Sequence, residues 1–188
     1  MDELKLETVN YKAIIEFWFS EPVNKQWFKS IPEFDAEILS KYHLTCVQAS
    51  NSQLDHWQDT AESCLALIIV LDQFPLNMFR GTAKSFSTEA KAISVSRTAI
   101  SNGFDKLLST TQLSFLYMPF MHSENLEDQN YSVKLYEKAG LESNLRFAKH
   151  HRSIIEKFGR FPHRNEILKR TNTSEELKYL ASPQAFKG

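Results

Sequence analysis

Residues 64–71 read Cys-Leu-Ala-Leu-Ile-Ile-Val-Leu and are followed at once by Asp72 and Gln73. A helix over this run is apolar on every side, which is typical of a helix enclosed by other helices rather than one at a surface. The run is far too short to cross a bilayer, so no membrane association is expected. The sequence therefore predicts a soluble protein built around one central helix.

Helical patterns continue on both sides of this run, and strand signals are nearly absent. Gly103, Gly140 and Gly159 each follow such a pattern directly, where a left-handed helix cap favours glycine. Three stretches have capping-box spacing and begin at Ser30, Ser109 and Thr173. We expect an all-α bundle of about eight helices, at residues 9–19, 32–50, 61–74, 88–102, 110–121, 124–139, 142–158 and 174–181.

Length and composition limit the classes of protein. A chain of 188 residues with 42% hydrophobic content suits one domain over residues 1–188. The net charge of -1 excludes a globally basic nucleic-acid binder, so a nucleic-acid partner is disfavoured. Residues 146–170 nevertheless hold eight Lys or Arg against two Glu. Cys46 and Cys64 fall in apolar contexts and are expected to be reduced, and the N-terminus has no signal-like pattern, so we expect a cytoplasmic protein.

Asp72 is a candidate catalytic residue, and its neighbour Gln73 is a candidate ligand-binding residue. Its position places a carboxylate on a face expected to be buried, at the negative end of a helix, so it needs a cation or strong donors. Arg80, Arg160 and Arg164 are the expected partners. The pair is either a structural clamp between interhelical turns or part of a ligand site.

Residues 158–165, Phe-Gly-Arg-Phe-Pro-His-Arg-Asn, form a turn with more cationic side chains than an interhelical connection needs. Arg160, Arg164 and Asn165 are expected to hold a carboxylate or phosphate group. His163 lies before a short helix, where free backbone donors favour an anion. His151 should point inward and His150 outward. Either His151 is a core residue or, with His163, it serves as acid or base.

Residues 117–129 contain a third polar cluster. Pro119 should disturb one helix, and Ser123 should cap the next one, with Glu124 in its first turn. Capping does not explain His122, which is therefore a candidate ligand-binding residue along with Glu124. Gln129 should also lie on an inner face, and we include it among the candidates.

Common cofactor and catalytic motifs are missing from the sequence. There is no pair of His, Glu or Cys residues at metal-ligand spacing, so a metal site would have to be assembled wholly by tertiary structure. No nucleophile elbow, phosphate-binding glycine loop or dinucleotide fingerprint occurs either. We expect no metal and no cofactor.

The spaced segments together resemble a bacterial family known as domain of unknown function 924. The residues that carry the resemblance are Phe17-Trp18-Phe19, Leu71-Asp72-Gln73-Phe74-Pro75, Asn77, Phe79-Arg80-Gly81, Tyr117-Met118-Pro119, His122-Ser123-Glu124, Asp128-Gln129 and residues 158–165. The resemblance covers nearly the whole chain. It implies an all-helical fold with antiparallel, tetratricopeptide-like helix packing, and it implies no particular activity. Leu76 departs from the family pattern, where a basic residue is usual, which weakens an anion site.

Three functional interpretations follow from these features. The leading one is a pocket between the turn after residue 72 and the turn at 158–165, closed by residues 122–129, which binds a small anionic or polar metabolite. Non-redox acid–base chemistry is compatible with it, although the sequence identifies no reaction and does not decide whether the protein is an enzyme. The second is a tetratricopeptide-like interaction module whose basic segment binds an acidic peptide. The third makes the polar clusters a purely structural network.

Overall fold

The computed structural model describes residues 9–187. Residues 1–8, for which no signal sequence is predicted, and residue 188 lie outside the described part. The described part covers residues 9–187 of the predicted domain 1–188. Within that range the secondary structure is entirely helical. The α-helices are α1 (Tyr11–Trp18), α2 (Glu21–Asn24), α3 (Pro32–Ser50), α4 (Ala61–Leu71), α5 (Gln73–Met78), α6 (Glu89–Ser101), α7 (Thr110–His122), α8 (Leu126–Lys138), α9 (Glu142–Phe158) and α10 (Ser174–Leu180).

Four 3-10 turns connect these helices: η1 (Asp55–Asp59), η2 (Ala83–Phe86), η3 (Phe104–Leu107) and η4 (Pro162–Arg164). The eight expected helices all occur. The short helices α2 and α5 were not predicted, and the pattern assigned to residues 61–74 is divided at Asp72 into α4 and α5. An all-α fold is confirmed.

Helix α4 is the centre of the fold. Residues 64–71 are all buried, and α4 contacts α1, α3, α5, α6 and α7. Ala61–Met78 is long and apolar enough to cross a membrane by composition, but 78% of this segment is buried inside the protein. It is therefore the core helix that the sequence predicts.

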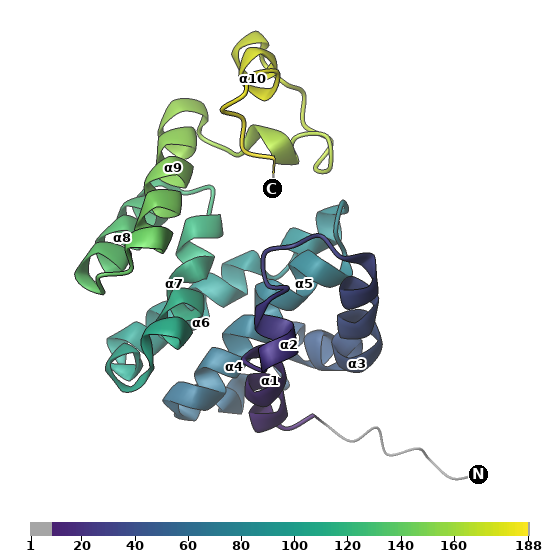
Figure 1. Ribbon diagram of the computed structural model, residues 1–188, viewed down its shortest axis with the longest axis vertical. Coiled ribbons are helices and arrows are strands. Elements are labelled where there is room, and N and C mark those ends of the chain that lie inside the picture. Colours follow the sequence, from purple (N-terminus) through teal and green to yellow (C-terminus); the bar gives the residue numbers. More distant parts are fainter. Residues whose placement is uncertain (1–8, 188) are drawn as a thin grey trace.

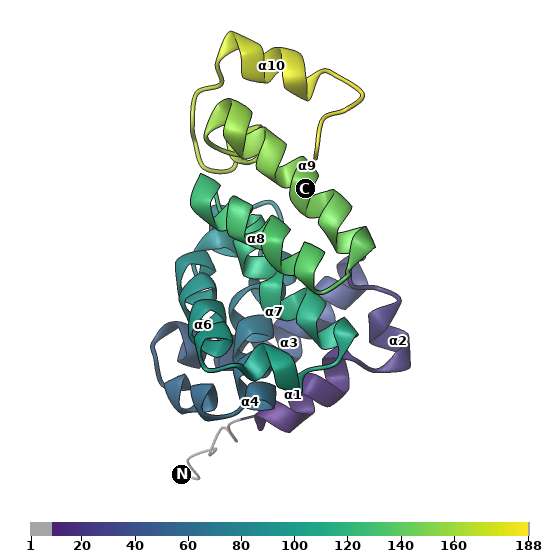
Figure 2. The ribbon, with the colours of Figure 1, turned by 90° about the vertical axis from the view of Figure 1, so that its left-hand side faces the viewer.

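The helices surround α4 on two sides (Figure 1). Helices α1 to α5 form one half and α6 to α9 the other, while η4 and α10 lie together at one end beyond α9. The turned view in Figure 2 shows α10 at the same end, separated from the helices around α4 by α8 and α9. A small cluster of Ile154, Ile155 and Phe161, distinct from the main core, packs beneath this C-terminal segment.

Several helix ends follow the predicted signals. Gly103, Gly140 and Gly159 have φ angles of 75°, 67° and 69°, the left-handed conformation expected after a helix. Capping boxes form at Ser109 and Thr173. The box predicted at Ser30 is wrong, because α3 begins after Ile31 with no side-chain cap.

The start of α8 also differs from the prediction. Its cap is Asn125, whose side chain accepts from the backbone N–H groups of Glu127 and Asp128, rather than Ser123. Pro119 lies inside α7, which continues to His122.

Cys46 and Cys64 are free and buried, and burial raises the pKa of Cys64 to about 12, as suits an unreactive core thiol.

Candidate functional site

A buried carboxylate and an imidazole meet where α4 gives way to α5. Asp72 is 4% exposed, and its Oδ1 lies 2.8 Å from Nδ1 of His122. Its other oxygen, Oδ2, accepts from Nε2 of Gln73 at 2.5 Å. Because a carboxylate only accepts, Nδ1 of His122 carries the proton. In the neutral ring Nε2 is then an unprotonated base.

The expected arginine partner of Asp72 is therefore wrong. The acid is matched by a histidine and an amide, because the end of α7 meets the α4–α5 junction. Arg80 instead donates to the carboxylate of Asp35 at 2.7 and 3.1 Å. Arg160 donates to Glu176 at 2.7 and 2.9 Å. Neither side chain bonds to Asp72.

The end of α7 is fixed by Gln129, which is fully buried. Its Nε2 donates to the backbone carbonyls of Met121 and Ser123, both at 2.7 Å. These carbonyls stand on either side of His122, so one buried amide holds the backbone that carries the imidazole. Met118, one turn earlier, has its Sδ 3.3 Å from Nε2 of Gln73. The expectation that Gln129 points inward is confirmed.

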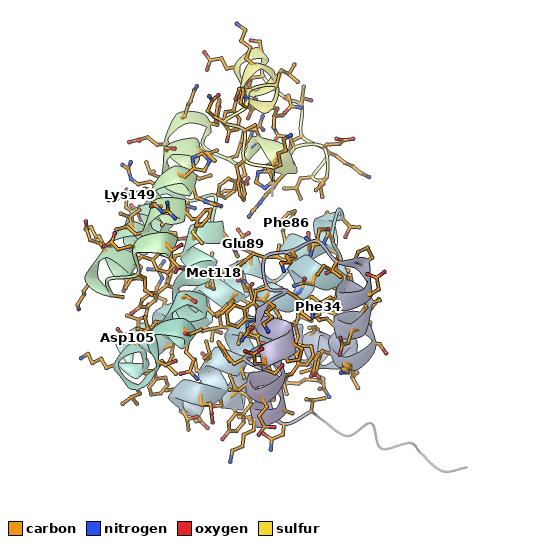
Figure 3. The ribbon with its side chains drawn as sticks, in the orientation of Figure 1. Phe34, Phe86, Glu89, Asp105, Met118 and Lys149 are labelled. Atoms are coloured by element: carbon orange, nitrogen blue, oxygen red, sulfur yellow. The ribbon has the colours of Figure 1, made fainter. Side chains whose placement is uncertain are left out.

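Arg164 joins the C-terminal segment to this site. Its guanidinium lies between the rings of Phe86 and Phe161, at 4.3 and 4.7 Å from their centroids. Nη1 donates to Oε2 of Glu89 at 2.9 Å, and Nη2 donates to the backbone carbonyl of His122 at 2.8 Å. Figure 3 labels Phe86 at the end of η2, Glu89 at the start of α6 and Met118 in α7. We call Asp72, Gln73, Glu89, His122 and Arg164 the central cluster.

The pKa of Glu89 is shifted by its surroundings in this cluster. Burial raises the pKa of Glu89 above its ordinary value, and the positive charge of Arg164 offsets part of that effect. The charges of His122 and Asp72 also act on it, in opposite directions. Glu89 and His122 are connected through Arg164, which donates to the carboxylate of one and to the backbone carbonyl of the other.

Glu124 belongs to a neighbouring network that fastens the C-terminal segment. Its carboxylate accepts from the backbone N–H of Phe161 at 2.7 Å and from Arg170 at 2.5 and 2.9 Å. Burial raises the pKa of Glu124, but the hydrogen bonds from Arg170 and Phe161 outweigh burial and leave the pKa below its ordinary value. Asn165, fully buried, accepts from Nε of Arg170 at 2.9 Å. Both residues are engaged by the protein itself.

The two candidate histidines pack around Phe186, and neither is hydrogen-bonded to Asp72. His151 is 5% exposed, its Nδ1 donates to the carbonyl of Phe147 at 2.8 Å, and burial lowers its pKa to about 3. The rings of His151 and His163 lie 4.4 and 5.0 Å from that of Phe186. Burial, with help from Arg164, lowers the pKa of His163 to about 4, and its Nδ1 is buried without a partner among residues 9–187. The inward orientation of His151 is confirmed.

Two open depressions occur elsewhere on the described surface. One, of about 410 Å³, adjoins His56 and Trp57, and the other, of about 510 Å³, adjoins Lys157 and Lys178. Neither is lined by the central cluster. Within residues 9–187 no three His, Cys, Asp or Glu side chains are grouped as metal ligands would be.

Sequence reasoning missed Glu89, Phe86 and Arg170. Glu89 occupies the first turn of α6, where a carboxylate is explained by the helix dipole alone. Phe86 precedes it in a short 3-10 turn, and Arg170 was counted only as one cation of a basic segment. Its bonds to Glu124 and Asn165 distinguish Arg170 from the other cations, and only the tertiary structure reveals them.

Fold and site together define an all-helical protein with a buried carboxylate–imidazole pair at the end of its central helix. The model of the bacterial protein family of unknown function DUF924 matches residues 14–184, so the chain belongs to this family. A solved structure, a protein of unknown function from Agrobacterium tumefaciens, is 38% identical with a TM-score of 0.87. The match covers 91% of this chain and 96% of that one. No match is found among curated proteins.

Proposed function

We propose that the central cluster binds a small polar metabolite and that His122 exchanges a proton with it. The observation that carries this proposal is the 2.8 Å contact between Asp72 and Nδ1 of His122. Asp72 fixes the tautomer and orientation of the ring, as a buried acid does for a catalytic histidine. Nε2 is then left as the basic atom.

Access to that atom supports the proposal. The His122 side chain is 18% exposed, whereas that of Asp72 is 3% exposed. Within residues 9–187 Nε2 forms no hydrogen bond, and it is not among the polar atoms that are buried without a partner. A purely structural histidine in such a network commonly uses both ring nitrogens. The reaction class that fits is non-redox acid–base chemistry.

A thermal-shift screen of small polar metabolites tests the proposal. A ligand of the folded state raises the melting temperature by mass action. We expect a compound that stabilises the wild type and has no effect on His122→Gln. His43, an exposed histidine of α3, provides the matched control, because His43→Gln should keep the response. A compound that stabilises all three proteins equally would bind elsewhere and contradict the proposal.

A peptide-binding role is the second candidate, and one observation favours it. On α9, Phe147 is 53% exposed between the exposed Arg146 and Lys149. An exposed aromatic ring among cations suits an acidic peptide with an apolar anchor. Titration of a fluorescent acidic peptide containing one Leu tests this role. Binding that Phe147→Ala abolishes would support it, and binding unaffected by that change would oppose it.

A further inference from the structure

The only guanidinium of the central cluster is already paired within the protein. The side chain of Arg164 is 6% exposed, and its Nη1 and Nη2 are bonded to Glu89 and to the His122 carbonyl. Its Nε is buried without a partner among the described residues, where the rings of Phe86 and Phe161 flank the guanidinium. The charge of this arginine is therefore matched by Glu89, and its unpartnered Nε–H is enclosed by the protein rather than presented at the surface.

The other expected anion-binding side chains are likewise neutralised. Arg80 is paired with Asp35 and Arg160 with Glu176. Arg170, in the same C-terminal segment as Arg160, is paired with Glu124. Each of these ion pairs would have to break before its arginine held a ligand anion, and breaking a part-buried pair leaves a carboxylate uncompensated.

Three acceptor atoms of the cluster are unused. Within residues 9–187, Oε1 of Glu89, Nε2 of His122 and Oε1 of Gln73 form no hydrogen bond. None of the three is among the polar atoms buried without a partner. The bare Nε2 follows from the proton on Nδ1, and a carboxylate oxygen can only accept. A ligand that fits these atoms must supply donors.

The charge of the cluster selects among donor ligands. Two carboxylates, Asp72 and Glu89, stand against one guanidinium, so a negative charge remains while His122 is neutral. Burial raises the pKa of Glu89 although Arg164 donates to its Oε2, and a cation at Oε1 would further stabilise its charged form. A neutral alcohol would supply hydrogen bonds without that charge.

We infer that the ligand of the central cluster is a small organic cation with N–H donors, in the class of primary amines, and that Glu89 is its charge-recognising residue. This inference rests on the proposed function of the same site. An ammonium group donates to Oε1 of Glu89 while His122 Nε2 accepts from the same or an adjacent group. The anionic ligand expected from the sequence is replaced by a cationic one.

Binding of matched ligand sets tests this inference by calorimetry. The probes are small primary amines, together with the carboxylate, the alcohol and the N-acetylated amine of each carbon skeleton. We expect only the amines to bind the wild type. Glu89→Gln should weaken them about tenfold or more, since it keeps the shape and removes the charge. Glu62, an exposed first-turn glutamate of α4, is the control, and Glu62→Gln should leave affinity unchanged.

The wild-type comparison stands even where Glu89→Gln does not fold. An acetylated amine that binds as tightly as its parent would overturn the inference, because acetylation removes the charge. A carboxylate or alcohol that binds, loses affinity in His122→Gln and outcompetes the amine would overturn it too, but would uphold the proposed function. Absence of binding by every class, with no compound from the wider metabolite screen, would contradict both.

Discussion

Asp72 and His122 are 50 positions apart in the chain, yet Oδ1 of one lies 2.8 Å from Nδ1 of the other. The contact joins the C-terminal end of α4 to that of α7. Two helix ends of negative polarity meet there, together with a buried carboxylate, so the imidazole N–H and the Gln73 amide supply the donors that the acid needs. This relationship underlies the proposed chemistry of the site.

Arg164 should be important for stability as well as for the site. Arg164→Ala leaves Glu89 without its cation and the His122 carbonyl without its donor. We expect the free energy of unfolding to fall by about 3 kcal/mol, measured by urea denaturation.

The control for this prediction is Lys25, whose ion pair with Glu21 is exposed, at 68% and 78% for the two side chains. Lys25→Ala should change the free energy of unfolding by no more than about 0.5 kcal/mol. Equal effects of the two changes would show that the Arg164 pair behaves as a surface pair.

Glu124 should hold the C-terminal segment in place. Glu124→Ala removes the bonds to Arg170 and to the Phe161 amide, so trypsin should cleave within residues 160–187 faster than in the wild type. Glu127, an exposed residue three positions later in the first turn of α8, is the matched control. If Glu127→Ala accelerated cleavage as much, loss of a first-turn charge on α8 would explain the result, and our assignment would be wrong.

His151 should make stability depend on pH. Its folded pKa, about 3, lies below the ordinary 6.5, so the unfolded chain binds the proton first as pH falls. The contribution of neutral His151 is present above pH 6.5 and is lost as pH falls towards its folded pKa. From about pH 7.5 to about pH 5 the loss is about 2 kcal/mol.

Comparison with His151→Gln isolates this contribution, since other groups titrate as well. Glu89, with its raised pKa, changes stability in the opposite direction over part of the range. The difference in free energy of unfolding between the two proteins should therefore shrink as pH falls. Parallel curves over the whole range would contradict burial of a neutral imidazole.

Arg160 should control the titration of Glu176. The guanidinium is the main reason that the pKa of Glu176 is lowered to about 2. Arg160→Met should raise this pKa towards its ordinary 4.5, as followed by the side-chain carboxyl resonance in an NMR titration. A pKa that stays near 2 would assign the effect to the capping bonds at Thr173.

The sequence specified most of the helices because their signals are local. The apolar run at 64–71 and the glycines at 103, 140 and 159 each determine a helix or its end without help from distant residues. Helix α5 is short and begins immediately after Asp72, so no periodicity separates it from α4. Its boundary depends on packing against α3.

The partners within the site depend on distant contacts and could not be predicted in the same way. That Asp72 is buried and needs a donor follows from its helix, but three arginines and several histidines are equally available in sequence. The choice of His122 follows from where α7 ends, which Gln129 fixes through two backbone carbonyls. Glu89 became visible only through its bond to Arg164, 75 positions away.

The tautomer of His122 is the most direct test of the account. Long-range ¹H–¹⁵N NMR of the ring, in mildly alkaline buffer, distinguishes a protonated nitrogen from a bare one. We predict a protonated Nδ1 and a bare Nε2 in the wild type, and loss of this preference in Asp72→Asn, where the neutral amide can also donate. A wild-type ring with its proton on Nε2 would contradict the donation to Asp72 and remove the base on which the proposed function depends.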